Sequence, residues 1–129
     1  MDIILLCGDP NSGKTTTMNL VYSDLIAKGA TIVGPKMQTG ENPLDFECIL
    51  KYNGKLIAIF SMGDYLHECW SAVIKYAYCD KLILAYSDKF TRSLATVVGH
   101  CHNHHVITKS RGNAATNNPS DAAIIVAHV

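Results

Sequence analysis

The feature of this chain that most constrains its fold is a glycine-rich segment of the form G-x-x-x-x-G-K-T at residues 8–15. It follows the apolar run of residues 3–7, which is long enough for a buried strand, and it precedes residues 15–28, where apolar side chains recur at helical spacing. In a glycine-rich turn, successive backbone N–H groups can converge on an anion at the positive end of a helix. A strand, this loop and a helix in that order predict a phosphate-binding loop.

The residues of the loop have separable predicted roles. Lys14 is expected to reach the β- and γ-phosphates of a nucleoside triphosphate, and Thr15 is expected to coordinate Mg²⁺ through its hydroxyl. The backbone N–H groups of residues 11–15 are expected to surround the phosphates. The loop residues predicted to bind the nucleotide are Gly8, Asp9, Pro10, Asn11, Ser12, Gly13, Lys14, Thr15 and Thr16.

Length and composition narrow the class of protein. A chain of 129 residues is expected to form a single domain over residues 1–129, with little room for a separate substrate domain. The formal net charge of zero gives no general attraction to nucleic acid or to an anionic membrane. The first apolar run is too short for a membrane span and lacks a preceding basic segment, so a cytoplasmic protein is expected. The five cysteines form no C-x-x-C pair and are expected to be free thiols.

The remaining pattern alternates between strand and helix signals. Strands are predicted at residues 45–51, 56–60, 82–86 and 106–108, with a hairpin at Asn53 and Gly54, and a short strand or turn at residues 31–34. Helices are predicted at residues 66–77 and 90–101. Residues 35–43 and 112–119 have loop composition. Residues 122–129 fit either a last helix or a sixth strand, and the helix is favoured.

Strands separated by helices predict an α/β fold of three layers, a mostly parallel sheet with helices on both faces and one antiparallel hairpin at an edge. Ligands of such sheets bind at the carboxyl ends of the strands. Four segments follow predicted strands, and we expect them to meet at one rim: residues 8–15, 61–64, 87–89 and 109–111.

On the loop and the order of elements, the chain resembles the P-loop nucleoside triphosphatase superfamily, and its loop GDPNSGKTT is similar to those of translation-factor-type small GTPases and ferrous-iron-transporter GTPase domains. Those GTPases carry D-x-x-G after their third strand, whereas here Phe60 stands three residues before Gly63. They also carry N-K-x-D, where this chain has T-K-S-R at residues 108–111. The resemblance implies that Lys109 lays its stem along the base, and with no carboxylate there for guanine, ATP is as good a candidate as GTP.

A carboxylate linked to Mg²⁺ is also expected at the rim. Asp64 is the best candidate because it lies just past a buried strand, although it could instead cap the helix at residues 66–77. Glu41, Asp45 and Glu47 are weaker alternatives, and the last two are expected to point to solvent from an edge strand.

The two arginines and the histidine cluster are further candidates. Arg111, on the predicted rim, could approach the base or stabilise phosphate charge during catalysis, while Arg92 is expected to be a surface residue. Residues 100–105 read H-C-H-N-H-H, whose i, i+4 spacings can place two metal ligands on a helix face. The same pattern also fits a core thiol followed by a polar helix end, which is the favoured interpretation.

The leading functional hypothesis is a Mg²⁺-dependent protein that binds ATP or GTP and hydrolyses it slowly, with Lys14, Asp64 and Arg111 as catalytic candidates and Thr15 and Asp64 at the metal. A small-molecule or nucleotide kinase is an alternative, but no basic lid is visible. A third possibility is a regulatory module that holds the nucleotide without turnover and shapes a surface for a protein partner, to which Tyr65, Tyr76 and Tyr78 could contribute.

Overall fold

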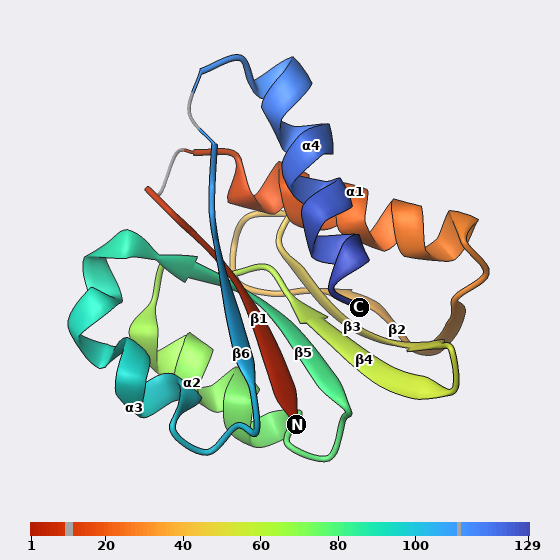
Figure 1. Cartoon of the computed structure of the whole chain (residues 1–129), viewed down its shortest axis with the longest axis horizontal. Coiled ribbons are helices and arrows are strands. Elements are labelled where there is room, and N and C mark those ends of the chain that lie inside the picture. Colours follow the sequence, from red (N-terminus) through yellow and green to blue (C-terminus); the bar gives the residue numbers. More distant parts are fainter. Residues whose placement is uncertain (10–11, 111) are drawn as a thin grey trace.

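The computed structural model describes residues 1–9, 12–110 and 112–129, and it has an α/β fold (Figure 1). In chain order the elements are β1 (Asp2–Gly8), α1 (Lys14–Ala27), β2 (Thr31–Gln38), β3 (Phe46–Tyr52), β4 (Lys55–Phe60), α2 (Leu66–Lys75), β5 (Lys81–Ser87), the 3₁₀ helix η1 (Asp88–Ser93), α3 (Leu94–Val98), β6 (His104–Thr108) and α4 (Ala114–Ala127). The alternation of strands and helices predicted from the sequence is confirmed.

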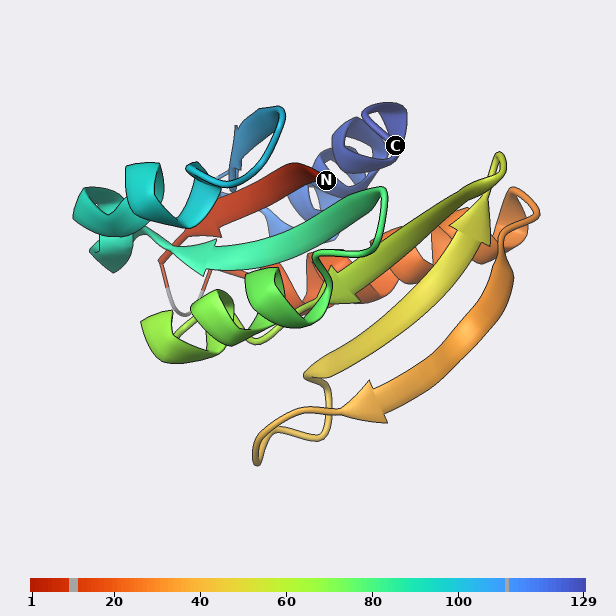
Figure 2. The ribbon, with the colours of Figure 1, turned by 90° about the horizontal axis from the view of Figure 1, so that it is seen from below.

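All six strands join one mixed sheet in the order β2-β3-β4-β5-β1-β6. Strands β4, β5, β1 and β6 are parallel to one another, whereas β2 pairs antiparallel with β3 and β3 with β4. The antiparallel strands twist away at one edge of the sheet (Figure 2). The predicted hairpin is present, with Asn53 and Gly54 between β3 and β4, both at positive φ. The sheet is therefore mostly parallel around β1, as predicted.

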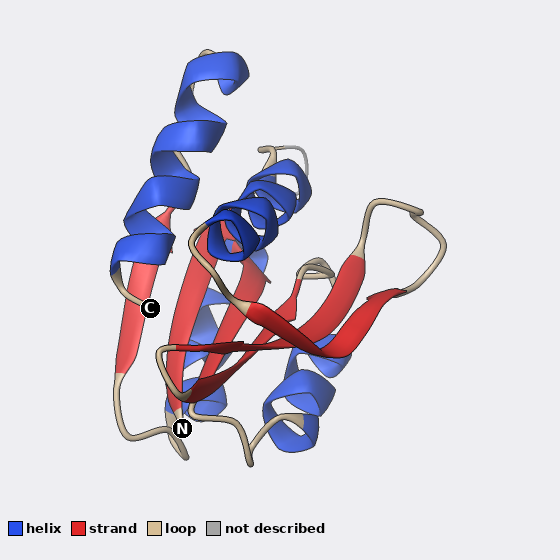
Figure 3. Ribbon diagram, turned by 90° about the vertical axis from the view of Figure 1, so that its right-hand side faces the viewer, coloured by secondary structure: helices blue, strands red, loops and turns tan. Residues whose placement is uncertain are grey.

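Helices cover both faces of the sheet (Figure 3). Helices α1 and α4 pack on one face, where Met18, Val21 and Ile125 are fully buried against residues of β1, β3, β4 and β5. Helices α2 and α3 pack on the other, where Cys69 and Val97 are fully buried. The alternation of side chains along each strand sends neighbouring residues into opposite layers, so both layers gain an apolar core. Among the helices of residues 1–9, 12–110 and 112–129, none has the length and apolarity needed to cross a membrane.

Three boundaries differ from the sequence-based expectation. Strand β2 continues to Gln38 through Pro35, which an edge strand tolerates because the pairing with β3 shifts register between Gly34 and Met37. Helix α4 begins at Ala114, so the prediction of a loop over residues 112–119 is wrong there. The Asn113 side chain caps the helix by accepting a hydrogen bond from the Ala115 N–H at 3.0 Å. The expected helix at residues 90–101 is split into η1 and the short α3.

Two other local predictions, the last helix and the free cysteine thiols, are confirmed. The favoured helix at residues 122–129 is the end of α4, although α4 stops at Ala127. Ser87 caps η1, since its hydroxyl accepts a hydrogen bond from the Lys89 N–H at 3.2 Å. All five cysteines are free thiols.

Candidate functional site

The glycine-rich loop connects the end of β1 to the start of α1 at the carboxyl edge of the parallel strands. Gly13 is the residue before the helix and has φ +89°, a left-handed conformation that glycine adopts without penalty. A Cβ on Gly13 would also lie 2.8 Å from the Asn118 side-chain oxygen of α4. Pro10 and Asn11 of the predicted nucleotide-binding set lie outside the described residues. The described part of the loop places the N-terminus of α1 at the predicted rim.

Lys14, the first residue of α1, folds back over this loop. Its side chain is only 4% exposed, and its ammonium donates to the backbone carbonyls of Gly8 at 2.9 Å and Asp9 at 2.7 Å. The same nitrogen lies 3.4 Å from a carboxylate oxygen of Asp64. A buried cation is therefore held at the loop by neutral oxygens and one carboxylate that is 46% exposed.

Thr15, the predicted metal ligand, contacts the carboxylate of Asp45, the residue just before β3. Its hydroxyl donates to Asp45 Oδ1 at 2.8 Å, and the hydroxyl of Ser61 donates to the same oxygen at 3.1 Å. Ser61 in turn accepts from the Phe46 N–H at 2.8 Å, which fixes the start of β3 against the end of β4. These bonds hold the Asp45 carboxylate against the first turn of α1.

The expectation that Asp45 and Glu47 point to solvent is therefore wrong. Asp45 immediately precedes β3 and turns inward to Thr15. Glu47 accepts hydrogen bonds from Lys75 and Tyr76 of α2. The donors to both carboxylates lie on other parts of the fold, and the local pattern of a strand cannot show which distant residues will contact it.

Asp64 reaches Lys14 because the segment after β4 passes very close to β5. A Cβ on Gly63 would lie 2.4 Å from the Ala85 carbonyl carbon, so only glycine fits, and the Gly63 carbonyl accepts from the Ser87 N–H at 3.0 Å. The residue before α2 is Tyr65, and no side chain caps that helix. Asp64 thus faces Lys14 and the glycine-rich loop, and the alternative of a helix cap is not observed.

The corner between β6 and α4 contains a buried ion pair. Lys109 donates to Asp121 Oδ2 at 2.7 Å, and both side chains are 1% exposed. Ser110 donates to the same carboxylate through its N–H at 3.0 Å and its hydroxyl at 2.8 Å. Burial by itself raises the pKa of Asp121, but the hydrogen bonds from Lys109 and Ser110 and the Lys109 charge outweigh it and hold the pKa below its usual value.

Asp121 is a residue that the sequence interpretation missed, because it lies within α4, in a segment whose composition indicated a loop or a helix start, and not directly after a strand. Thr16, by contrast, lies exposed on the first turn of α1, near the corner that Lys109 helps to form. Arg111 lies outside the described residues. Arg92 is exposed on η1, as expected.

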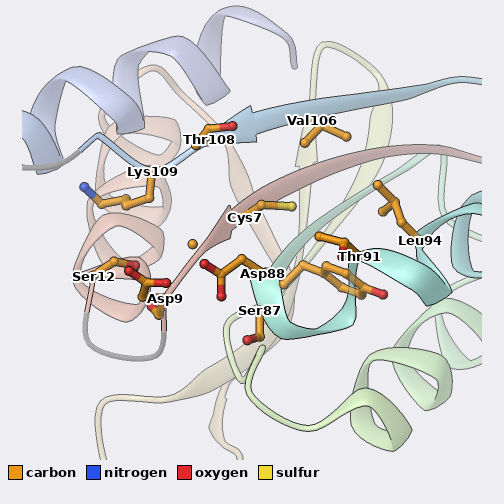
Figure 4. Close-up of a pocket in the computed structure, with 12 residues that line it drawn as sticks. Cys7, Asp9, Ser12, Ser87, Asp88, Thr91, Leu94, Val106, Thr108 and Lys109 are labelled. Carbon is orange, nitrogen blue, oxygen red and sulfur yellow. The ribbon is translucent and has the colours of Figure 1, made fainter.

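Three cavities surround the loop. The loop–α4 cavity, about 440 Å³, lies between Ser12, Thr16 and Lys109 on one side and Asn118 on the other. The acidic cavity, about 560 Å³, lies beyond the Lys14 ammonium and has four carboxylates in its lining: Glu41, Asp45, Asp64 and Glu68. The strand-end cavity, about 220 Å³, lies where β1, β5 and β6 end and is shown in Figure 4.

The histidine cluster is dispersed in the structure. His102 contacts the N-terminal amine, and the ring of His105 lies 4.6 Å from that of His128, the residue after α4. No group of three or more His, Cys, Asp or Glu side chains within residues 1–9, 12–110 and 112–129 is placed to hold a metal ion. Tyr65 and Tyr78 are exposed, whereas Tyr76 is buried under Glu47 and cannot belong to an open partner surface.

Comparison of the chain with models of protein families, with curated proteins and with solved structures finds no match in any of the three.

Proposed function

We propose that this chain is a Mg²⁺-dependent nucleoside triphosphate-binding protein that hydrolyses ATP or GTP slowly, as its resemblance to P-loop nucleoside triphosphatases implies. The observation that carries the proposal is the pair Lys14 and Thr15 on the first turn of α1. Lys14 places a buried ammonium at the loop, and Thr15 places a hydroxyl against the Asp45 carboxylate. A cation, a helix N-terminus and a hydroxyl–carboxylate pair in one place are what a magnesium-bound triphosphate requires.

The phosphates would replace the oxygens that Lys14 now contacts. The ammonium donates to two backbone carbonyls, which are neutral acceptors, and hydrogen bonds to charged phosphate oxygens are shorter and roughly twice as strong. The backbone N–H groups of the first turn of α1 have no partners within the helix and point toward the same space. The triphosphate would thus gain from both the loop and the helix.

The Mg²⁺ ion would be held between the phosphates and the contact of Thr15 with Asp45. Hydroxyl and carboxylate oxygens are the hard ligands that Mg²⁺ takes in proteins, and the two side chains are 2.8 Å apart. Asp64 approaches from the Lys14 side and adds negative charge. When bound, the ion would neutralise charge on the phosphates.

A prediction follows for these two carboxylates. In Asp45→Asn the Mg²⁺-induced gain in ATP affinity should fall about tenfold, or about 1.4 kcal/mol, because the amide keeps the hydrogen bonds from Thr15 and Ser61 but loses the charge. Asp64→Asn should have a smaller effect. Calorimetric titration with and without Mg²⁺ measures both. Asp24→Asn on α1 is the matched control, and an equal loss in that variant would contradict the assignment.

The base would enter the loop–α4 cavity, beside Thr16 and the stem of Lys109. The carboxylate in the lining of this cavity is that of Asp9, at the start of the loop. Asp121 is 1% exposed and bonded to Lys109 and Ser110, so it offers no acceptor to guanine. This supports a site that accepts both purine nucleotides.

A second candidate is a nucleotide-binding module without turnover of its own. It is favoured by one observation: Arg92 is exposed on η1 and does not line any of the three cavities described above. Positive charge in the transition state accelerates phosphoryl transfer strongly, so a site that lacks it turns over slowly. Release of inorganic phosphate distinguishes the two candidates. The hydrolase releases phosphate on its own, whereas the module releases it only when a protein partner is added.

The test of the proposed function is a calorimetric titration of ATP and GTP into the protein, with and without Mg²⁺. We expect saturable binding at one site per chain, tighter in the presence of Mg²⁺, because both the loop and the Thr15–Asp45 pair contact the ligand. The dissociation constants for ATP and GTP should lie within about tenfold of each other. Absence of binding by either nucleotide at millimolar concentration would refute the proposal.

A further inference from the structure

The strand-end cavity is not needed by the proposed nucleotide site, yet it lies against the same loop. It lies on the face of the sheet that α2 and α3 cover, and its apolar wall is made by Cys7, Leu94, Val106 and the buried Tyr86. Figure 4 shows Cys7 and Val106 facing Leu94 across the cavity. Crevices at the carboxyl ends of strands, where the chain connections lead to opposite faces of the sheet, are the usual ligand sites of α/β sheets.

The cavity is open because the connection from β5 to β6 leaves part of the edge strand β6 uncovered. Val106 is paired with Leu5 of β1 and lies on the same face. Leu5 is fully buried, whereas Val106 is 44% exposed, since the five residues of α3 end before they cover the edge strand. An apolar surface that the fold leaves open beside a loop is available to a ligand.

The polar part of the lining suits a neutral ligand that carries hydrogen-bond donors. The carboxylates of Asp9 and Asp88 line the cavity, and they favour ring N–H and exocyclic amino groups over an anion (Figure 4). Ser87, Thr91 and Thr108 contribute hydroxyls, which can donate or accept. Lys109 also lines the cavity, but its ammonium is bound to Asp121 and points away from Leu94 and Val106 (Figure 4). Burial raises the pKa of the Cys7 thiol to about 11, so that wall is neutral at pH 7. The lining therefore offers apolar faces and hydrogen-bonding edges, and no ammonium directed at an anion.

We propose that the strand-end cavity binds an uncharged heteroaromatic ring of about the size of a nucleobase, as a second ligand beside the nucleotide. The ring faces would pack between Leu94 and Val106, and its ring nitrogens and exocyclic groups would pair with the hydroxyls of Thr91 and Thr108. A cavity of about 220 Å³ is below the range of pockets for drug-sized ligands, which favours a single ring system.

The second ligand would lie next to the nucleotide without overlapping it. The strand-end cavity and the loop–α4 cavity share Asp9, Ser12 and Lys109 in their linings, and otherwise lie against different elements. Ligands on the two sides of one loop change each other's affinity through that loop, and the change is equal in both directions. The cavity is therefore suited to an acceptor or an effector of the nucleotide site.

The experiment uses free adenine and free uracil as probes and a variant that fills the cavity. Val106→Trp places an indole in the strand-end cavity at a half-exposed edge position. Val33→Trp makes the same exchange on the opposite edge strand, β2, at a position 54% exposed. Ligand-observed NMR titrations measure the affinity of each base for wild type and both variants, and thermal unfolding confirms that the variants fold.

We expect at least one base to bind wild type saturably and to lose tenfold or more in affinity in Val106→Trp, with Val33→Trp unchanged. Equal binding by both variants, or no saturable binding of either base to wild type, overturns the proposal. Competitive displacement of the base by Mg²⁺-ATP from wild type also overturns it, because the ring would then occupy the nucleotide site. Titration of Mg²⁺-ATP into the same variants tests the proposed nucleotide binding separately. Either proposal can therefore fail without deciding the other.

Discussion

Lys14→Ala is expected to weaken the binding of Mg²⁺-ATP and Mg²⁺-GTP by about 100-fold or more. Hydrogen bonds to charged groups contribute about 1.5–3 kcal/mol each, and the Lys14 ammonium has reach for at least two phosphate oxygens, so a loss of about 3 kcal/mol follows. The ammonium already lies at the loop, within 3.0 Å of the Gly8 and Asp9 carbonyls, and little reorganisation is needed to bind the ligand. Calorimetric titration of both nucleotides measures the effect.

The fold of the Lys14 variant should persist, because the substitution removes a desolvated cation. It leaves two backbone carbonyls and the Asp64 carboxylate, which is 46% exposed and can be solvated by water. We expect the free energy of unfolding to change by less than about 1 kcal/mol. Lys28→Ala, at the exposed C-terminal end of the same helix, is the matched control and should bind nucleotide like wild type. Unchanged affinity in the folded Lys14 variant would show that the loop does not contact the phosphates.

The glycine-rich loop between β1 and α1 could be located from sequence because its information is local. Glycine, lysine and threonine at fixed spacing between a strand and a helix specify a backbone path and its charge over eight residues, and the structure places Lys14 and Thr15 at the start of α1 as expected. The carboxylate at Thr15 could not be identified in the same way. Asp45 lies 30 residues away, and only the pairing of β3 with β4 brings it there through Ser61.

The fold was predictable to a similar extent and for similar reasons. The period of the apolar residues indicates which side chains are buried. The helices and strands around β1 and β5, two strands that are covered on both faces, could therefore be predicted. Residues 112–119 were misassigned because their glycine, asparagine and proline indicate a loop, while the Asn113 cap and the packing of α4 on α1 decide the outcome. The position of β5 in the sheet, between β4 and β1, depends on long-range pairing that no local pattern encodes.

Asp121→Asn is expected to lower the free energy of unfolding by about 3–5 kcal/mol. The substitution leaves the Lys109 ammonium buried without its counter-charge, and breaking one partner of a buried ion pair has this cost. Asn also loses part of the pairing with Ser110, since its amide has one acceptor oxygen where the carboxylate has two. Urea unfolding at pH 7 measures the difference, and Asp24→Asn on α1 should change it by less than about 0.5 kcal/mol.

The pH dependence of this difference identifies its electrostatic origin. Hydrogen bonds and the Lys109 charge hold the pKa of Asp121 below its unfolded value despite burial, so its stabilisation is fully present above the unfolded pKa. The difference in the free energy of unfolding between wild type and Asp121→Asn should be constant above about pH 5. It should shrink below about pH 4, because the carboxylate is protonated as the pH falls toward its folded pKa. The double substitution Lys109→Met with Asp121→Leu should recover most of the loss, since an apolar pair of similar volume removes the uncompensated charge. A gap that is independent of pH down to acid unfolding, with no recovery in the double variant, would mean that packing at this corner outweighs charge.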